Sequence, residues 1–193
     1  MTAIGKDTIV IVSGLPRSGT SMMMRMLDKG GIPALTDQLR VADEDNPKGY
    51  YEFEPVKKTK TDPSWLERAP GKVVKMVHLL LLDLPTDREY HVVFMKRKLE
   101  EVIRSQNVML ERKGKSTDDL PAEQIMGMFR QQMRQVDEYI RSHPNFRILY
   151  VDYNQLLADP RPPVTAINQF LGGKLNTQAM LEVVDPTLYR QRA

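Results

Sequence analysis

Short runs of consecutive apolar residues alternate along the chain with longer stretches in which apolar residues recur every three or four positions. Strands buried on both faces are predicted for residues 9–12, 73–77, 91–95 and 146–151. Helical spacing predicts helices over residues 21–29, 99–110, 121–141 and 163–171, and near Asn176. Strands that alternate with helices favour parallel βαβ units. We therefore expect a three-layer α/β fold, with a mainly parallel sheet of about four to five strands flanked by helices.

The first predicted strand leads directly into a loop that carries Gly14 and Gly19. The apolar face of the helix that follows is predicted to consist of Met22, Met23, Met26 and Leu27. A strand, a glycine-spaced loop and a helix start together favour anion binding, because backbone N–H groups and the helix N-terminus add positive potential. The Gly-x4-Gly spacing is that of a nucleotide-binding P-loop. The sequence thus predicts a P-loop fold that binds its ligand at the carboxyl ends of the strands.

The cation of this loop differs from that of a nucleotide kinase. A Walker A loop has lysine directly after its second glycine, and here that position is Thr20. The basic residue lies inside the loop, as Arg17. A guanidinium keeps its charge and can bind two oxyanion oxygens at once. The loop therefore offers amides, hydroxyls and one fixed cation in an arrangement unlike that of a kinase.

The segment Gly14-Leu15-Pro16-Arg17-Ser18-Gly19-Thr20-Ser21 resembles the 5′-phosphosulfate loop of sulfotransferases that use 3′-phosphoadenosine 5′-phosphosulfate (PAPS). The resemblance implies transfer of a sulfuryl group from PAPS to a hydroxyl or amine of a small-molecule acceptor, without a metal. Adenosine 3′,5′-bisphosphate (PAP) would be the product. It also implies a catalytic role for Arg17 and cofactor contacts at Pro16, Arg17, Ser18, Gly19, Thr20 and Ser21.

Two later segments extend the resemblance. Residues 94–105 resemble the family's 3′-phosphate motif, in which an arginine and a serine eight positions later, here Arg97 and Ser105, hold that phosphate. This chain has Lys98-Leu99 where the family often has Asn-Pro or Asp-Pro. Residues 149–160 resemble a Tyr-Glu-Asp-Leu segment, with Asn154-Gln155 replacing Glu-Asp, and imply that Tyr153 borders the adenine. Arg190, with Arg192, is expected to reach the phosphates of the cofactor.

The base that accepts the proton of the acceptor has two candidates. Lys75, Met76, Val77 and His78 resemble the Lys-Thr-His segment of cytosolic sulfotransferases, which implies His78 as base, but with one residue inserted. Glu52 lies in a Gly-Tyr-Tyr-Glu segment that resembles a Gly-Tyr-Phe-Glu segment of a bacterial branch of the family. Both residue types serve as bases once their pKa is tuned. Lys75 is expected to hold charge on the transferring group, and Glu54 is a third candidate base.

Composition and charge limit the possible domain organisation, partners and location of the protein. The chain has 193 residues, a net charge of +3 and no cysteine. This predicts a single domain without disulfides or thiolate metal sites. Acidic and basic residues are mixed along the chain, so we expect no nucleic-acid partner. No apolar run is long enough for a membrane span, and we expect a cytoplasmic enzyme.

Two alternatives to the sulfotransferase remain open at this stage. A small P-loop kinase of a nucleotide or metabolite would need Mg²⁺ and a lysine where the chain has Thr20. A non-catalytic nucleotide-binding protein could use the same scaffold and the same phosphate contacts. Thermal stabilisation by PAP, and none by ATP with Mg²⁺, would distinguish a sulfotransferase from such a kinase.

Overall fold

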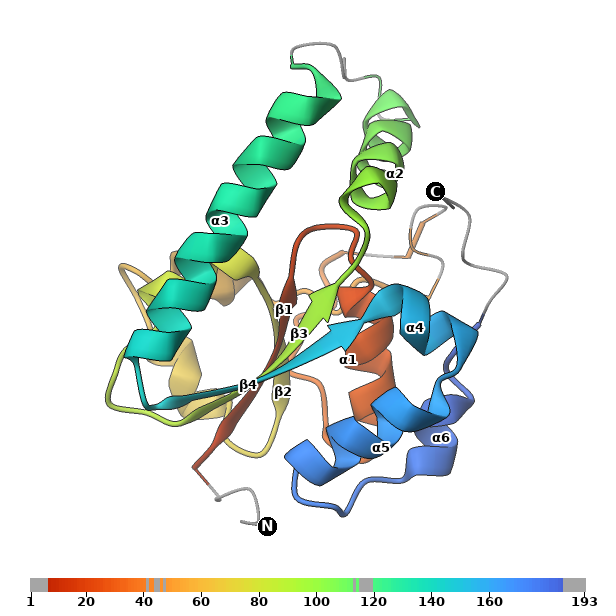
Figure 1. The fold of residues 1–193 in the computed structure, drawn as a ribbon. Helices are drawn as coiled ribbons and strands as arrows, with labels where there is room; N and C mark the ends of the chain where they lie inside the picture. The colour runs from red at the N-terminus through yellow and green to blue at the C-terminus, as the bar shows by residue number, and fades with distance from the viewer. Residues whose placement is uncertain are drawn as a thin grey trace.

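The computed structural model describes residues 7–40, 42–43, 46, 48–112, 114 and 120–185. Its centre is a sheet of four strands, namely β1 (Ile9–Gly14), β2 (Val73–Val77), β3 (Tyr90–Lys96) and β4 (Phe146–Asp152). All pairings are parallel and the order is β2-β1-β3-β4 (Figure 1). The predicted α/β class and the parallel sheet are confirmed. Each strand coincides with one of the predicted apolar runs, within two residues at either end.

The register brings the carboxyl ends of the strands to one edge. Gly14, the last residue of β1, is opposite Val77 in β2 and Met95 in β3. Lys96 at the end of β3 is opposite Asp152 at the end of β4. The segments that follow the four strands therefore start side by side along this edge, which is where parallel sheets bind ligands.

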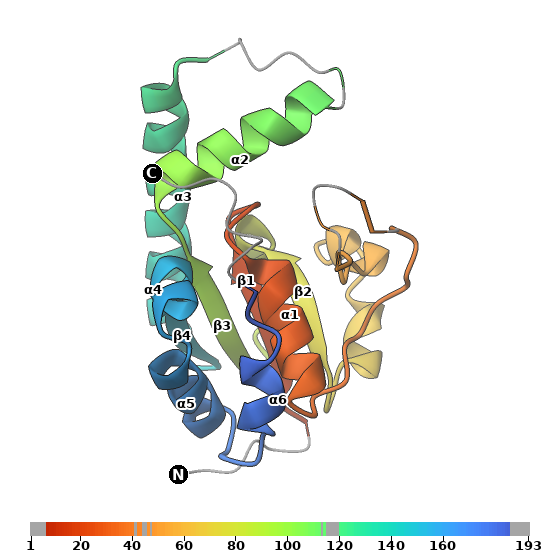
Figure 2. The ribbon, with the colours of Figure 1, turned by 90° about the vertical axis from the view of Figure 1, so that its right-hand side faces the viewer.

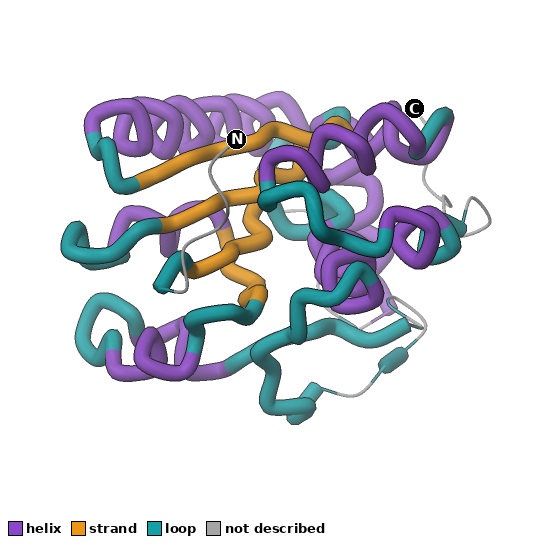
Figure 3. Tube along the Cα trace, turned by 90° about the horizontal axis from the view of Figure 1, so that it is seen from below, coloured by secondary structure: helices purple, strands orange, loops and turns teal. Residues whose placement is uncertain are grey.

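Helices cover both faces of the sheet (Figures 1 and 3). On one face lie α1 (Thr20–Lys29), α4 (Tyr153–Ala158), α5 (Arg161–Phe170) and α6 (Thr177–Leu181). On the other lie α3 (Ala122–Ser142) and the 3₁₀ helices η1 (Glu54–Lys58), η2 (Ser64–Arg68) and η3 (His78–Asp83). The remaining helix, α2 (Leu99–Arg112), extends across the carboxyl edge (Figure 2).

Two hydrophobic cores result from the alternation of side chains along β1. Ile9 and Ile11 pack toward α3 and the 3₁₀ helices, in a core with Trp65, Leu66 and Val136. Val10 and Val12 face the opposite way and pack on α1, α5 and α6, in a core with Met23, Ile167 and Met180. A strand that is buried on both faces reads as a continuous apolar run, which is why β1 was predictable.

The apolar face predicted for the first helix is partly wrong. Met24 is buried together with Met23, Met26 and Leu27, whereas Met22 is only half-buried and lines a pocket at the carboxyl edge of the sheet. The reason is that α1 packs against α6 as well as against the sheet, so a second side of the helix is covered.

The long helix α3 buries fewer residues than its apolar pattern predicts. Apolar residues recur at helical spacing along it, at Ile125, Phe129, Met133, Val136 and Ile140. Only Val136 and Ile140 of these are buried, because the N-terminal half of the helix extends beyond the sheet (Figure 1).

Candidate active site

A pocket of about 340 Å³ opens at the carboxyl edge of the sheet. Its walls include the loop after β1, the start of α1, residues 40, 46, 48–50 and 52, the end of β2 and one face of α2. Its acidic lining residues are Glu52 and Asp185, and its basic ones are Arg17, Arg25, Arg40, Lys48, Lys75, Arg97 and Arg112. This excess of positive charge suits an anionic ligand.

The loop between β1 and α1 is shaped by close contacts at its two glycines. Gly19 has φ of 95°, and a Cβ atom there would lie 2.4 Å from Cδ2 of Tyr153. A Cβ atom on Gly14 would lie 2.6 Å from the hydroxyl of Ser18. Neither position can hold a side chain without moving its neighbours, so the glycines allow the backbone to approach both groups. Tyr153 is buried, and its ring packs against the loop at Gly19.

The predicted cofactor residues of the loop fall into two groups. Pro16, Arg17, Gly19, Thr20 and Ser21 line the pocket. Since Thr20 and Ser21 begin α1, the unpaired N–H groups of its first turn belong to this wall. Ser18 does not line it: its buried hydroxyl donates to the carbonyl of Leu15 at 2.7 Å. Its observed role is to hold the turn.

Arg17 and the residues predicted for the 3′-phosphate lie in direct contact. The Nε of Arg17 donates to Oγ of Ser105 at 3.0 Å, which joins the loop to α2. In the other direction, Nη1 of Arg97 donates to the backbone carbonyl of Arg17 at 3.0 Å. The guanidinium carbon of Arg97 also lies 4.6 Å from the ring centroid of Tyr153. The structure thus brings together four residues predicted from three separate segments of the chain.

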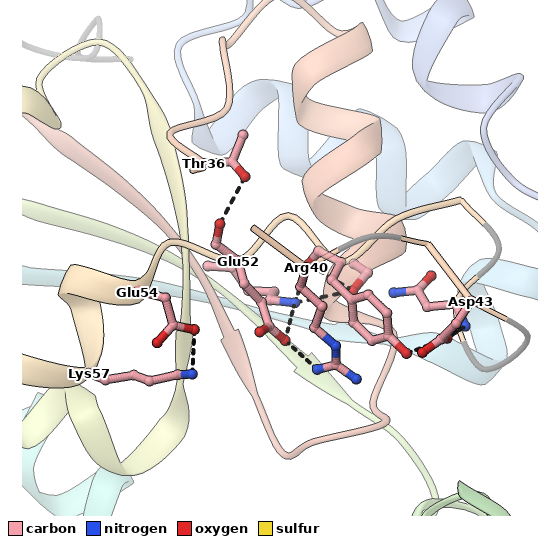
Figure 4. Close-up of polar contacts among 10 residues, drawn as sticks. Thr36, Arg40, Asp43, Glu52, Glu54 and Lys57 are labelled. Atoms are coloured by element: carbon pink, nitrogen blue, oxygen red, sulfur yellow. Dashed lines mark hydrogen bonds and ion pairs between the residues drawn. The ribbon is translucent and has the colours of Figure 1, made fainter. Parts of the chain in front are cut away.

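Lys75 and Glu52 form a second cluster on the opposite side of the loop. The ammonium of Lys75 lies 3.7 Å from Oε1 of Glu52 and donates to Oγ of Ser21 at 3.3 Å and to the carbonyl of Tyr50. The same Glu52 oxygen is 2.8 Å from Nη1 of Arg40 (Figure 4). The Glu52 backbone is fixed as well, because its carbonyl accepts a hydrogen bond from Thr36 at 2.8 Å.

Burial lowers the pKa of Lys75 from its ordinary value of 10.5 to about 8, and Arg40 and Arg17 act in the same direction against Glu52. Only the protonated ammonium can attract an anionic substrate. We therefore expect kcat/KM for PAPS, which reports groups of the free enzyme, to fall as the pH rises through about 8. A Lys75→Arg variant keeps its charge, so its profile should stay level to a pH at least about one unit higher. The same alkaline decline in both proteins would contradict this assignment.

The other candidate bases lie outside the pocket lining. His78 is buried at the start of η3, and its Nε2 lies 3.0 Å from Oε1 of Gln132 in α3. Burial lowers its pKa, and the contacts with Gln132 and the Gly14 backbone oppose that shift. Glu54 is exposed and pairs with Lys57 at 2.5 Å, apart from Glu52 (Figure 4). Arg190 and Arg192 lie outside the described residues, so their predicted role is untested.

Several residues of the site were not singled out from the sequence. Arg40 lies over the ring of Tyr50, 3.3 Å from its centroid, in a polar segment without periodicity. Arg25 lines the pocket one turn beyond Ser21, a spacing that could have revealed it. Glu101 is fully buried and pairs with Arg97 at 2.9 Å. The available signal was the spacing of four between Arg97, which lies between β3 and α2, and Glu101 in the first turn of α2.

Neither a metal cluster nor a membrane span is found in the part of the chain that the structure describes. No three His, Cys, Asp or Glu side chains gather there in a way that could hold a metal ion. None of the helices in those ranges is both long and apolar enough to cross a bilayer.

The fold and the site together define a P-loop-like α/β protein whose pocket is rich in positive charge, with Arg17 as the cation of its loop. Residues 7–191 match the model of the sulfotransferase domain family. The chain belongs to the sulfotransferase family, as the three sequence segments implied. No curated protein is similar enough to count as a match.

Solved structures support the same fold. A sulfotransferase from Mycobacterium tuberculosis H37Rv superposes with a TM-score of 0.60 at 19% identity, over 92% of this chain and 71% of that one. The sulfotransferase domain of the Synechococcus PCC 7002 olefin synthase gives 0.57 at 15% identity, over 100% and 90%. A retinol dehydratase in complex with androsterone and the inactive cofactor PAP gives 0.54 at 19% identity, over 93% and 63%. The chain thus spans less than two thirds of that enzyme.

Proposed function

We propose that the protein is a PAPS-dependent sulfotransferase that moves the sulfuryl group to a hydroxyl or amine of a small-molecule acceptor. The observation that carries this proposal is the position of two cationic clusters on either side of one loop. Arg17, Arg97 and Ser105 form one cluster, and Lys75 lies with Glu52 in the other. Membership of the sulfotransferase family supports the same reaction.

The charges and donors present fit this nucleotide. PAPS supplies an activated sulfuryl group on its 5′-phosphate and carries a second anionic group at its 3′-position. Arg97 and Ser105 would hold the 3′-phosphate, while the start of α1 and Arg17 would bind the 5′ end. Lys75 lies next to Ser21 in the first turn of α1, so its ammonium would stabilise charge near the transferring group.

We assign the proton acceptor to Glu52 rather than to His78. Glu52 lines the pocket with 23% of its side chain exposed, and one of its oxygens faces Lys75. The proton that leaves the acceptor hydroxyl or amine would pass to the Glu52 carboxylate as the acceptor atom bonds to sulfur. The bond between sulfur and the 5′-phosphate oxygen would break at the same time, and PAP would leave. His78 is turned toward Gln132 and does not line the pocket.

The proposed acceptor is a small molecule with an apolar part. Val77 at the end of β2 is 45% exposed, although its neighbour Met76 is buried. Val77, Val108 and Met109 line the pocket between β2 and α2. An apolar portion of the acceptor would cover them and gain hydrophobic stabilisation. The single-domain organisation and the cytoplasmic location of the protein stay predictions from the sequence.

Ligand binding separates this proposal from a nucleotide kinase. PAP at about 100 times its dissociation constant should stabilise the fold by about 2.7 kcal/mol. For a chain of this size that is a rise in Tm of about 5–10 °C, measurable by calorimetry. ATP with Mg²⁺ should give no shift, because the Walker lysine is replaced by Thr20. Stabilisation by ATP with Mg²⁺ and none by PAP would favour the kinase.

A further inference from the structure

The carboxylate of Glu101 is a fully buried charged group that has no role in the proposed reaction. It lies in the first turns of α2 with 0% of its surface exposed. One of its oxygens is 2.9 Å from Nε of Arg97, and the other accepts a hydrogen bond from the Asn154 amide at 2.9 Å. A carboxylate removed from water is tolerated only where a cation and hydrogen-bond donors compensate for lost hydration. Both kinds of partner are present.

Arg97 is fixed by these contacts at the rim of the pocket. Its Nε pairs with Glu101, its Nη1 donates to the carbonyl of Arg17, and its guanidinium lies over the ring of Tyr153. Its side chain is 7% exposed, yet it contributes to the pocket lining. A long arginine side chain loses rotamer entropy when it is immobilised. Since the contacts hold Arg97 before a ligand arrives, that entropy loss does not weaken ligand binding.

Asn154 complements Glu101 from the neighbouring helix. Its amide nitrogen donates to Glu101, and its amide oxygen accepts from the backbone N–H of Lys98 at 3.5 Å. An acidic side chain at position 154 would place a second carboxylate against a buried one, which is unfavourable. Through its two hydrogen bonds, Asn154 links the start of α4 to the start of α2, next to Arg97.

We propose that Glu101, supported by Asn154, is a positioning residue that orients the Arg97 guanidinium toward the 3′-phosphate of the nucleotide. This inference rests on the proposed function, because it takes Arg97 as the ligand of that phosphate. Glu101 itself touches neither substrate. Its effect should therefore appear in the selectivity for a 3′-phosphate rather than in nucleotide binding as a whole.

The test compares PAP with adenosine 5′-monophosphate, which differ only in the 3′-phosphate. Calorimetric titration gives the ratio of their dissociation constants for the wild type, Glu101→Gln, Asn154→Asp and Arg97→Ala. Glu100→Gln is the matched control, because it makes the same change at an exposed position one residue away. We expect Glu101→Gln to reduce the ratio about tenfold or more, as for loss of a charge-assisted contact. Asn154→Asp should act similarly, Arg97→Ala should set the maximum loss, and Glu100→Gln should match the wild type.

The possible outcomes separate the two proposals. A folded Glu101→Gln protein with the wild-type ratio, or with equal weakening of both ligands, would overturn the positioning role. Should Glu101→Gln not fold, the ratio in Asn154→Asp decides in the same way. A wild-type protein that binds both nucleotides equally would contradict the 3′-phosphate assignment itself, before any variant is considered.

Discussion

Replacing Arg17 with alanine should lower kcat/KM for PAPS by a factor of about 10³ while leaving the protein folded. The side chain is half-buried in the pocket wall and donates to Ser105, so its loss removes a fixed charge from the anion site. Arg17 has φ of 69°, a conformation that alanine adopts no less readily than arginine, so the loop backbone should keep its shape. Initial-rate kinetics with thermal unfolding as a folding check measure both effects.

The substitution Arg17→Lys provides the control for charge. A lysine side chain there would keep a positive charge but would lack the planar, forked donor arrangement of a guanidinium. We expect partial activity in Arg17→Lys, between that of the wild type and that of Arg17→Ala. Wild-type turnover in Arg17→Ala would show that the loop does not bind the reacting end of the nucleotide.

Glu52→Gln should reduce kcat by a factor of about 10²–10⁴, the usual contribution of a general base. Glutamine keeps the shape of the side chain and an oxygen toward Arg40 and Lys75 but cannot accept the proton of the acceptor. PAP affinity should change little, because Glu52 contacts Lys75 and Arg40 rather than Arg97. Single-turnover rates with PAPS, together with PAP titration, separate the chemical step from nucleotide binding.

A His78→Asn variant tests the rival base. The histidine lies outside the pocket and contacts Gln132, so this substitution should affect stability more than turnover. We expect its kcat to stay within about threefold of the wild type, well short of the loss of a general base. The reverse ranking, with Glu52→Gln active and His78→Asn inactive, would transfer the catalytic role to His78.

Local sequence patterns were sufficient to predict the sheet and to find the loop, arginine and serine residues that the structure brings together at the pocket. The runs that became β1 to β4 are apolar because these strands are largely buried on both faces, and burial of that kind leaves a strong signal. The loop was recognisable because Gly14 and Gly19 are demanded by contacts with Ser18 and Tyr153. Arg97 and Ser105 follow a strand at a fixed spacing, so the local sequence is enough to recognise this motif.

Residues whose role depends on distant partners were less accessible. Arg40 meets Glu52 and Tyr50 only because the irregular segment after α1 folds back over the pocket. The choice between His78 and Glu52 could not be made from the sequence, since it depends on whether each residue reaches the pocket. The side-chain direction of Ser18 was equally hidden, because the same motif is compatible with a hydroxyl turned inward or toward the ligand.

The two separate cores on either side of the sheet support different parts of the pocket. The β1–α1 loop, α1 and Tyr153 rest on one core, whereas Phe53 and Val56, which follow Glu52, belong to the other. Substitutions in the second core could therefore change the walls proposed to bind the acceptor, while the loop proposed to bind PAPS keeps its shape. With two separate cores, the residues proposed to bind the acceptor can change while those proposed to bind the nucleotide are retained.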